Sequence, residues 1–163
     1  MKKVLSLLLG LLLLFTVACA DTVYDLDGGF QIALPENTTT YSNWYYVDNV
    51  MFSLTVYELA DYGYQQQWLD SLKDTVMETL TVMMFGTNDG FQNEEIAAGI
   101  PCASFQYTEQ GYEYRIALAL NGTKLLATVM TDSTTGKYPD EAVCRSILNA
   151  ISVQTQENMQ ATT

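Results

Sequence analysis

Three strand-like segments joined by two tight turns limit the folds open to this chain more than any other feature. IPCASFQY (100–107) leads through Glu109-Gln110-Gly111 into YEYRIALAL (112–120). Asn121-Gly122 then connects this segment to TKLLATVMT (123–131). Asn-Gly between two apolar segments favours a type I′ turn, whose twist suits antiparallel strands. We therefore expect an antiparallel meander of three strands in the second half of the chain.

Two segments have the period of a helix. From Gln65 to Phe85 apolar residues recur every four positions, which predicts a long amphipathic helix that ends at Gly86. Its predicted buried face consists of Trp68, Leu72, Val76, Leu80 and Met83 or Met84. A second helix is expected to begin at Pro139, with acidic residues in its first turn. The apolar face of this helix is formed by Val143, Cys144, Ile147, Leu148 and Ile151.

The first part of the chain has the alternation typical of strands. Residues 24–34 alternate around Asp27-Gly28-Gly29, which predicts two strands joined by a turn. Residues 36–43 are predicted to form a polar loop. Further strands are expected at residues 49–59, 92–97 and 152–155.

This order of elements predicts an α+β fold. Strands joined by hairpins pair with their neighbours, and each amphipathic helix needs an apolar sheet face to cover. We therefore expect an antiparallel β-sheet with the long helix and the C-terminal helix packed on it. No repeat or linker divides the sequence, so residues 21–155 are predicted to form a single domain, followed by a frayed tail at 156–163.

Residues 1–20 have the three parts of an export signal. Lys2 and Lys3 form a short positive end, residues 4–17 are almost all apolar, and Ala18-Cys19-Ala20 supplies small residues. The apolar stretch is shorter than the twenty or so residues that a membrane-spanning helix needs. The sequence therefore predicts a bacterial protein that is exported and loses this segment.

Two cleavages compete at the end of the signal. Cleavage after Ala20 releases a free chain that starts at Asp21 and discards Cys19. The alternative is a lipoprotein, since TVAC resembles a bacterial lipobox in which Cys19 becomes the lipid-modified first residue. Thr16 stands where such boxes usually have Leu, and strand-like sequence begins almost at once, without a polar tether. These two features favour a free, secreted protein.

The charge of the chain excludes some partners. Without Lys2 and Lys3, five basic residues face nineteen acidic ones, which leaves a net charge of −14. Such a charge repels phosphate backbones and anionic lipid surfaces. We therefore expect no nucleic-acid partner, and membrane contact only through a lipid on Cys19.

The sequence resembles the PsbP-like family of exported α/β/α-sandwich domains. The resemblance rests on GGFQIALP (28–35), on the long helix after the third strand, and on GIPCASFQYTEQGYEYRIALAL (99–120), and it covers nearly all of residues 21–155. The tryptophan that usually follows the LP element is displaced to Trp44. Members of the family serve as extrinsic subunits and binding accessories, so the resemblance implies an accessory role and no catalytic residues.

The residue types present restrict the chemistry. The chain has no histidine, which excludes Ser-His and Cys-His nucleophile activation and imidazole ligation of a metal. Glu94 and Glu95 are adjacent on a predicted strand, so they point to opposite faces and form no catalytic pair. Asp25-x-Asp27-Gly28 lacks the further ligands of a calcium loop and is interpreted as a turn. We expect a non-enzymatic protein without metal or cofactor; the alternative is a small exported enzyme that uses carboxylates.

Aromatic residues in polar segments are the candidate binding residues. Such rings combine apolar faces with polar tips, and they are suited to a groove for a protein, peptide or glycan partner. The competing interpretation is that they shield the ends of the sheet. The residues are Tyr41, Trp44, Tyr45, Tyr46, Tyr62 and Tyr64.

Cys102 and Cys144 are a candidate disulfide. Both fates of Cys19 leave them as the only unmodified thiols in an exported chain, where disulfides persist. Cys144 lies on the apolar face of the last helix, and small residues beside Cys102 allow that helix to approach. The alternative is that both are buried free cysteines that act as small hydrophobic groups.

Overall fold

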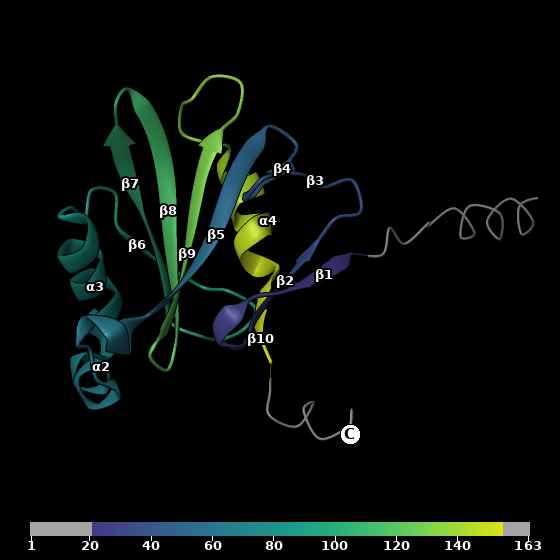
Figure 1. Ribbon diagram of the computed structural model, residues 1–163. Coiled ribbons are helices and arrows are strands. Elements are labelled where there is room, and N and C mark those ends of the chain that lie inside the picture. Colours follow the sequence, from purple (N-terminus) through teal and green to yellow (C-terminus); the bar gives the residue numbers. More distant parts are fainter. Residues whose placement is uncertain (1–20, 155–163) are drawn as a thin grey trace, which may run out of the picture.

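The computed structural model of the protein describes residues 21–154, and the predicted meander lies at its centre (Figure 1). The predicted signal at 1–20, including Cys19, and the predicted tail at 156–163 lie outside the described residues. A seven-stranded antiparallel sheet has the order β3-β4-β5-β9-β8-β7-β6. Its strands are β3 (Thr39–Tyr41), β4 (Trp44–Val47), β5 (Val50–Glu58), β6 (Gln92–Glu94), β7 (Cys102–Glu109), β8 (Tyr112–Asn121) and β9 (Lys124–Asp132).

A second, three-stranded sheet corrects the expectation of a single sheet. β1 (Thr22–Asp25) and β2 (Phe30–Leu34) form the predicted pair around the predicted turn, and β10 (Ile151–Val153) adds to the other edge of β2. β2 is therefore the central strand of a separate sheet, with β1 and β10 at its edges.

The predicted polar loop at 36–43 contains the start of a small hairpin. β3 and β4 pair antiparallel, with Thr39 opposite Tyr46 and Tyr41 opposite Trp44. Ser42 has a φ of 56°, which allows the chain to reverse within two residues. The threonines and aromatic residues on either side of this turn favour strands, and they outweigh the polar composition of the loop.

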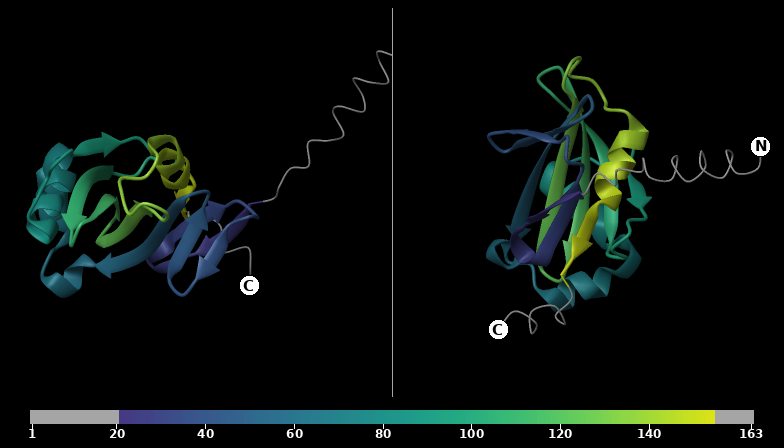
Figure 2. Two further views of the ribbon diagram at one scale, coloured as in Figure 1. Left: turned by 90° about the horizontal axis from the view of Figure 1, so that it is seen from above. Right: turned by 90° about the vertical axis from the view of Figure 1, so that its right-hand side faces the viewer.

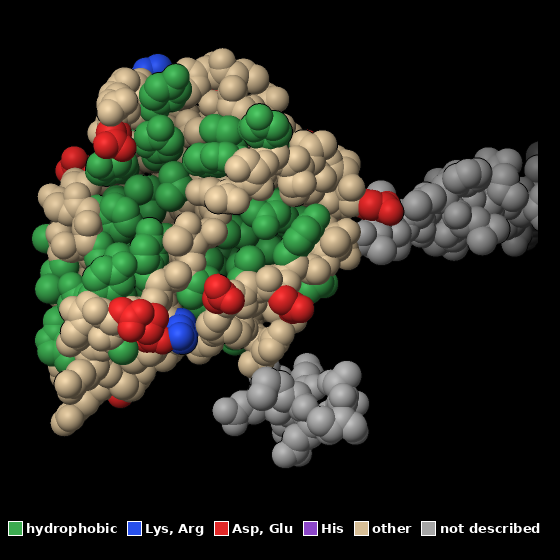
Figure 3. Space-filling view, in the orientation of Figure 1, with side chains coloured by type: hydrophobic (Ala, Val, Ile, Leu, Met, Phe, Trp, Pro, Cys, Tyr) green, Lys and Arg blue, Asp and Glu red, His purple; other side chains and the backbone are tan. Residues whose placement is uncertain are grey.

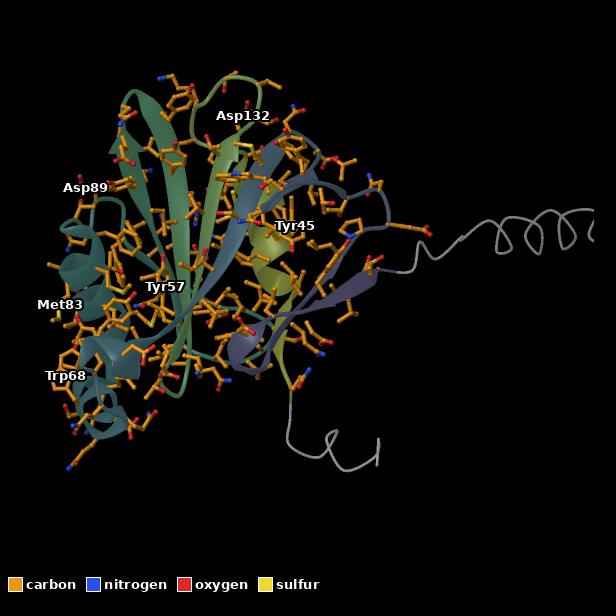
Figure 4. The ribbon with its side chains drawn as sticks, in the orientation of Figure 1. Tyr45, Tyr57, Trp68, Met83, Asp89 and Asp132 are labelled. Carbon is orange, nitrogen blue, oxygen red and sulfur yellow. The ribbon has the colours of Figure 1, made fainter. Side chains whose placement is uncertain are left out.

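The predicted long helix is divided in two. α2 (Gln66–Leu72) ends at a 3₁₀ turn (Lys73–Thr75), and α3 (Val76–Phe85) follows. Lys73 has φ 47° and ψ −121°, which breaks the helical path. The predicted apolar face is retained on either side of the break: Trp68, Leu72 and Met84 pack with the buried Val76 and Leu80, whereas Met83 is 53% exposed on the outer side of α3 (Figure 4). The buried residues of the two helices are Leu69, Val76, Met77, Leu80 and Thr81.

Other elements pack on both faces of the large sheet (Figure 2). α2 and α3 lie on one face, while α4 (Glu141–Asn149) and the small sheet lie on the other. α4 begins two residues after the predicted start at Pro139, because Asp140 caps it: the Asp140 side chain accepts hydrogen bonds from the backbone N–H groups of Ala142 and Val143. Ile151, which was predicted on the apolar face of this helix, lies in β10 instead, because α4 ends at Asn149. Within residues 21–154, no helix is long and apolar enough to cross a membrane.

Replacement of Lys73 tests the strained break between the helices. Lys73→Gly should raise the free energy of unfolding by about 1 kcal/mol, because glycine adopts positive φ without a Cβ clash. Asp74→Gly, at a neighbour without positive φ, should lower it by about 0.5–1 kcal/mol. Urea unfolding measures both variants. Equal losses of stability would contradict the strain at Lys73.

Candidate functional site

α2 and α3 together form the helical layer, which leaves part of one sheet face uncovered (Figure 2). A row of paired residues crosses six strands on this face: Tyr41, Trp44, Ser53, Val129, Ile116 and Phe105. At the β7 end, Phe85 of α3 covers Phe105, with ring centroids 5.0 Å apart. Phe105 is 1% exposed, whereas Tyr41 at the other end of the row is 74% exposed. Hydrophobic side chains gather on the strands beside the helical layer (Figure 3).

An open hollow of about 380 Å³ lies on this face. The next row places Tyr107 opposite Tyr114, and Phe85 contacts Tyr107 with a centroid distance of 6.4 Å. The hollow is lined by Trp44, Ser53, Phe85, Tyr107, Glu109, Tyr114, Ile116 and Val129. We call the following residues the aromatic face: Tyr41, Trp44, Ser53, Tyr107, Tyr114 and Val129.

Three of the six predicted aromatic residues lie on this side of the sheet. Tyr41 and Trp44 belong to the aromatic face, and Tyr46 lies two positions after Trp44 on the same side of β4. Tyr45 points the other way, where its ring stacks on Phe52 at 5.3 Å between the sheet and α4 (Figure 4).

The other two predicted residues lie elsewhere. Tyr62, at the end of a 3₁₀ turn (Leu59–Tyr62), is exposed and contacts Tyr57 with centroids 6.5 Å apart. Tyr64 packs on Trp68 with ring centroids 5.3 Å apart, against the apolar residues that α2 and α3 bury on the sheet. The structure therefore does not bring all six residues into one surface.

Tyr107 and Tyr114 were missing from the sequence prediction. Both lie in the predicted meander, at positions that alternate with outward-facing residues on the other side of the sheet. The hairpin at Gln110-Gly111 sets the register that places them opposite each other. This register, combined with the alternation of side chains along a strand, is the sequence signal that identifies both tyrosines.

A buried ionic network lies on the opposite side of the sheet. The Glu94 side chain is 3% exposed and pairs with Arg115, while Ser104 Oγ donates a hydrogen bond of 2.5 Å to it. Arg115 also donates to Ser104 Oγ at 2.8 Å. Arg145 Nη1 on α4 lies 3.8 Å from the second carboxylate oxygen. The network therefore joins β6, β7, β8 and α4.

Glu94 is the last residue of β6 and is buried, whereas Glu95 follows the strand and is exposed. Two guanidinium groups compensate the Glu94 charge, and a hydroxyl group occupies one of its oxygens. This arrangement holds the carboxylate in place.

Removal of the Glu94 charge tests the network. Glu94→Gln should lower the free energy of unfolding by about 3 kcal/mol, because it leaves the mostly buried Arg115 without its ion partner. Glu95→Gln is the matched control and should change stability by less than about 0.5 kcal/mol. Denaturant titration measures the free energy of unfolding of both variants. Similar losses for the two would show that the ionic network does not stabilise the fold.

Cys102 and Cys144 are free thiols in the structure, so the predicted disulfide is not formed. Both lie in the apolar cluster between the sheet and α4, where they pack as small hydrophobic groups. Burial raises the pKa of Cys102 to about 12 and that of Cys144 to about 11. Both sulfurs therefore stay protonated at neutral pH, the state in which thiols are unreactive.

Thiol counting tests this correction. Exported protein that is unfolded without reductant should show two reactive thiols, and the folded protein should react much more slowly because both sulfurs are buried. Reduced protein, unfolded in the same way, is the control for complete labelling. The absence of reactive thiols in unreduced, unfolded protein would restore the disulfide.

Comparison with known proteins gives structural similarity only. No family model matches the chain, and no curated protein matches it. The solution structure of cyanobacterial PsbP (CyanoP) from Synechocystis is similar, with 11% identity, 86% of this chain and 96% of that chain covered, and a TM-score of 0.46. A crystal structure from Bacteroides thetaiotaomicron has 9% identity, 83% of this chain and 42% of that chain covered, and a TM-score of 0.32.

The first of these structures is a PsbP protein, the family that the sequence resembles. The α+β class of this chain follows from its own strand order and helices, and it agrees with the sequence prediction. No residue role is transferred from either protein.

Proposed function

We propose that the protein is an exported, non-enzymatic binding domain that recognises a protein, peptide or glycan through its aromatic face. Export rests on the signal-like segment at residues 1–20. Binding rests on the aromatic face and the hollow beside it.

The observation that supports binding is the partial exposure of large aromatic side chains around one hollow. Trp44, Tyr107 and Tyr114 are each half-buried, although Phe105 and Ile116 in the neighbouring positions are buried. Tryptophan and tyrosine contribute most strongly to interfaces, because they bury a large area with few rotatable bonds. A partner would cover the part of the sheet that α3 does not reach.

The surroundings of the aromatic face suit recognition. Glu109 is the charged residue that lines the hollow, and Ser53 supplies a hydroxyl group. A mainly apolar surface with a few polar groups is typical of ligand sites, in which the polar groups fix orientation. The buried ionic network lies across the sheet and is occupied with its own contacts.

Replacement of Trp44 tests the proposed function. Immobilised protein is used to capture partners from the extracytoplasmic fraction of the source culture, and each captured species is then purified and titrated. Trp44→Ala and Tyr114→Ala should each weaken binding about tenfold or more, with little change in Tm, because both side chains are half-exposed.

Tyr62→Ala is the matched control, since Tyr62 is an exposed aromatic residue outside the aromatic face. Its affinity should equal that of the unchanged protein. A partner that binds the Trp44→Ala and Tyr114→Ala variants as tightly as the unchanged protein would refute recognition through the aromatic face.

A further inference from the structure

The outer edge of β7 is only partly paired. β6 covers the first three residues of β7, with Glu94 opposite Cys102 and Gln92 opposite Ser104. β7 continues to Glu109, beyond the last residue that β6 reaches. An unpaired strand edge presents backbone N–H and C=O groups in the geometry that another strand needs.

The direction of these backbone groups follows from the hydrogen bonds of β7. Leu120 N–H donates to Pro101 C=O at 2.9 Å, so the odd-numbered residues of this segment bond to β8. The backbone N–H and C=O groups of the even-numbered residues point away from β8. One of them, Gln106 N–H, donates a hydrogen bond to Asp89 C=O at 2.8 Å. Among residues 21–154, Gln106 C=O and both backbone groups of Thr108 have no backbone partner at this edge.

A hollow of about 460 Å³ lies along the unpaired edge. Gln106, Tyr107 and Thr108 line it from β7, and the remaining lining residues are Phe85, Thr87, Asp89 and Tyr138. Phe85 and Tyr107 also line the hollow of the aromatic face. A strand added to β7 would therefore place alternate side chains against Phe85 and Tyr107.

The charges around this edge indicate the charge of the partner. Asp89 lies beside the edge at the end of the helical layer (Figure 4), and Glu109 is exposed at the end of β7. Lys137, the basic residue on the neighbouring loop, already pairs with Glu113 at 2.7 Å. With a net charge of −14 for residues 21–163, the protein attracts a cationic partner and repels an acidic one.

We propose that the partner of the aromatic face is an extended peptide segment, rich in Lys or Arg, that pairs with Gln106 and Thr108 as an added strand. An apolar side chain of this segment packs against Phe85 and Tyr107, and its basic side chains lie near Asp89 and Glu109. The inference rests on the proposed function, of which it specifies the class of partner.

Thr108→Pro removes the outward N–H that an added strand would use. The change leaves the β7–β8 ladder intact, because Thr108 N–H does not bond to β8, and proline is tolerated at such edge positions. Thr108→Val is the matched control: it keeps the N–H and removes only the hydroxyl contact with Tyr138, which measures 3.3 Å.

A phage-displayed library of short random peptides is the probe. Peptides selected on the purified protein should be enriched in Lys or Arg and in apolar residues. Their affinity should fall with salt, because charged contacts are screened. A synthetic copy of the best peptide should bind Thr108→Pro about tenfold more weakly than the unchanged protein, and Thr108→Val within about twofold.

A second measurement is independent of how the variants fold. Methylation of single backbone nitrogens in the peptide should abolish binding at alternate positions that face β7 and have little effect at the positions between them. No alternation, together with full binding to Thr108→Pro, would overturn strand addition.

The outcomes separate this inference from the proposed function. Loss of binding in Trp44→Ala with none in Thr108→Pro leaves the aromatic face as the site and refutes pairing at the edge. Peptides that bind independently of Trp44 contradict the proposed function. Selection of acidic peptides, or of none, refutes the basic peptide. A dimer of this chain that Thr108→Pro dissociates would assign the edge to a second copy and overturn the inference.

Discussion

Strand β8 is apolar on both faces, and the arrangement of the other elements follows from the need to cover both. Every residue from Ile116 to Leu120 is buried. The larger side chains of this stretch face α2 and α3, whereas Ala117 and Ala119 face α4 and allow that helix to approach closely. One amphipathic layer per face satisfies this constraint. Because α3 packs mainly on β7 and β8, the same arrangement leaves the aromatic face open.

The two sides of the sheet therefore differ in how complete their cover is. On the α4 side, the small sheet and α4 bury Phe52, Met130 and the two cysteines, and the Glu94–Arg115 pair fixes the position of β6. On the α2–α3 side, the cover ends at Phe85. The buried core is thus concentrated on the closed side of the sheet and on the part of the other side that α2 and α3 cover. We propose recognition only for the part that stays open, where substitutions remove few buried contacts.

Local sequence signals predicted the elements that depend on neighbouring residues. The Asn121-Gly122 hairpin, the strand pair around Asp27-Gly28-Gly29 and the helix start after Pro139 each rest on a few adjacent residues, and all three are present.

Features that depend on distant residues were not predictable in this way. β10 pairs with β2 across most of the chain, and the partner of Glu94 is set by the register of three strands. The break at Lys73 has no sequence signal, since lysine does not favour positive φ. Trp44 stands out because it lies among polar residues, whereas Tyr107 and Tyr114 are recognised only when the hairpin register is combined with the alternation of side chains.

The small sheet determines how the domain is presented to its surroundings. Thr22 and Val153 are the outer ends of two strands that flank β2, so the described chain enters and leaves through the same sheet (Figure 1). β6 and β7 lie at the other end of the molecule, beside α3. Attachment to a surface, a lipid or a fused protein at either terminus would therefore hold the domain by the small sheet. Thr22 pairs with Leu34 and Val153 with Phe30, at opposite ends of β2, so tethers at the two termini would present the larger sheet in different orientations.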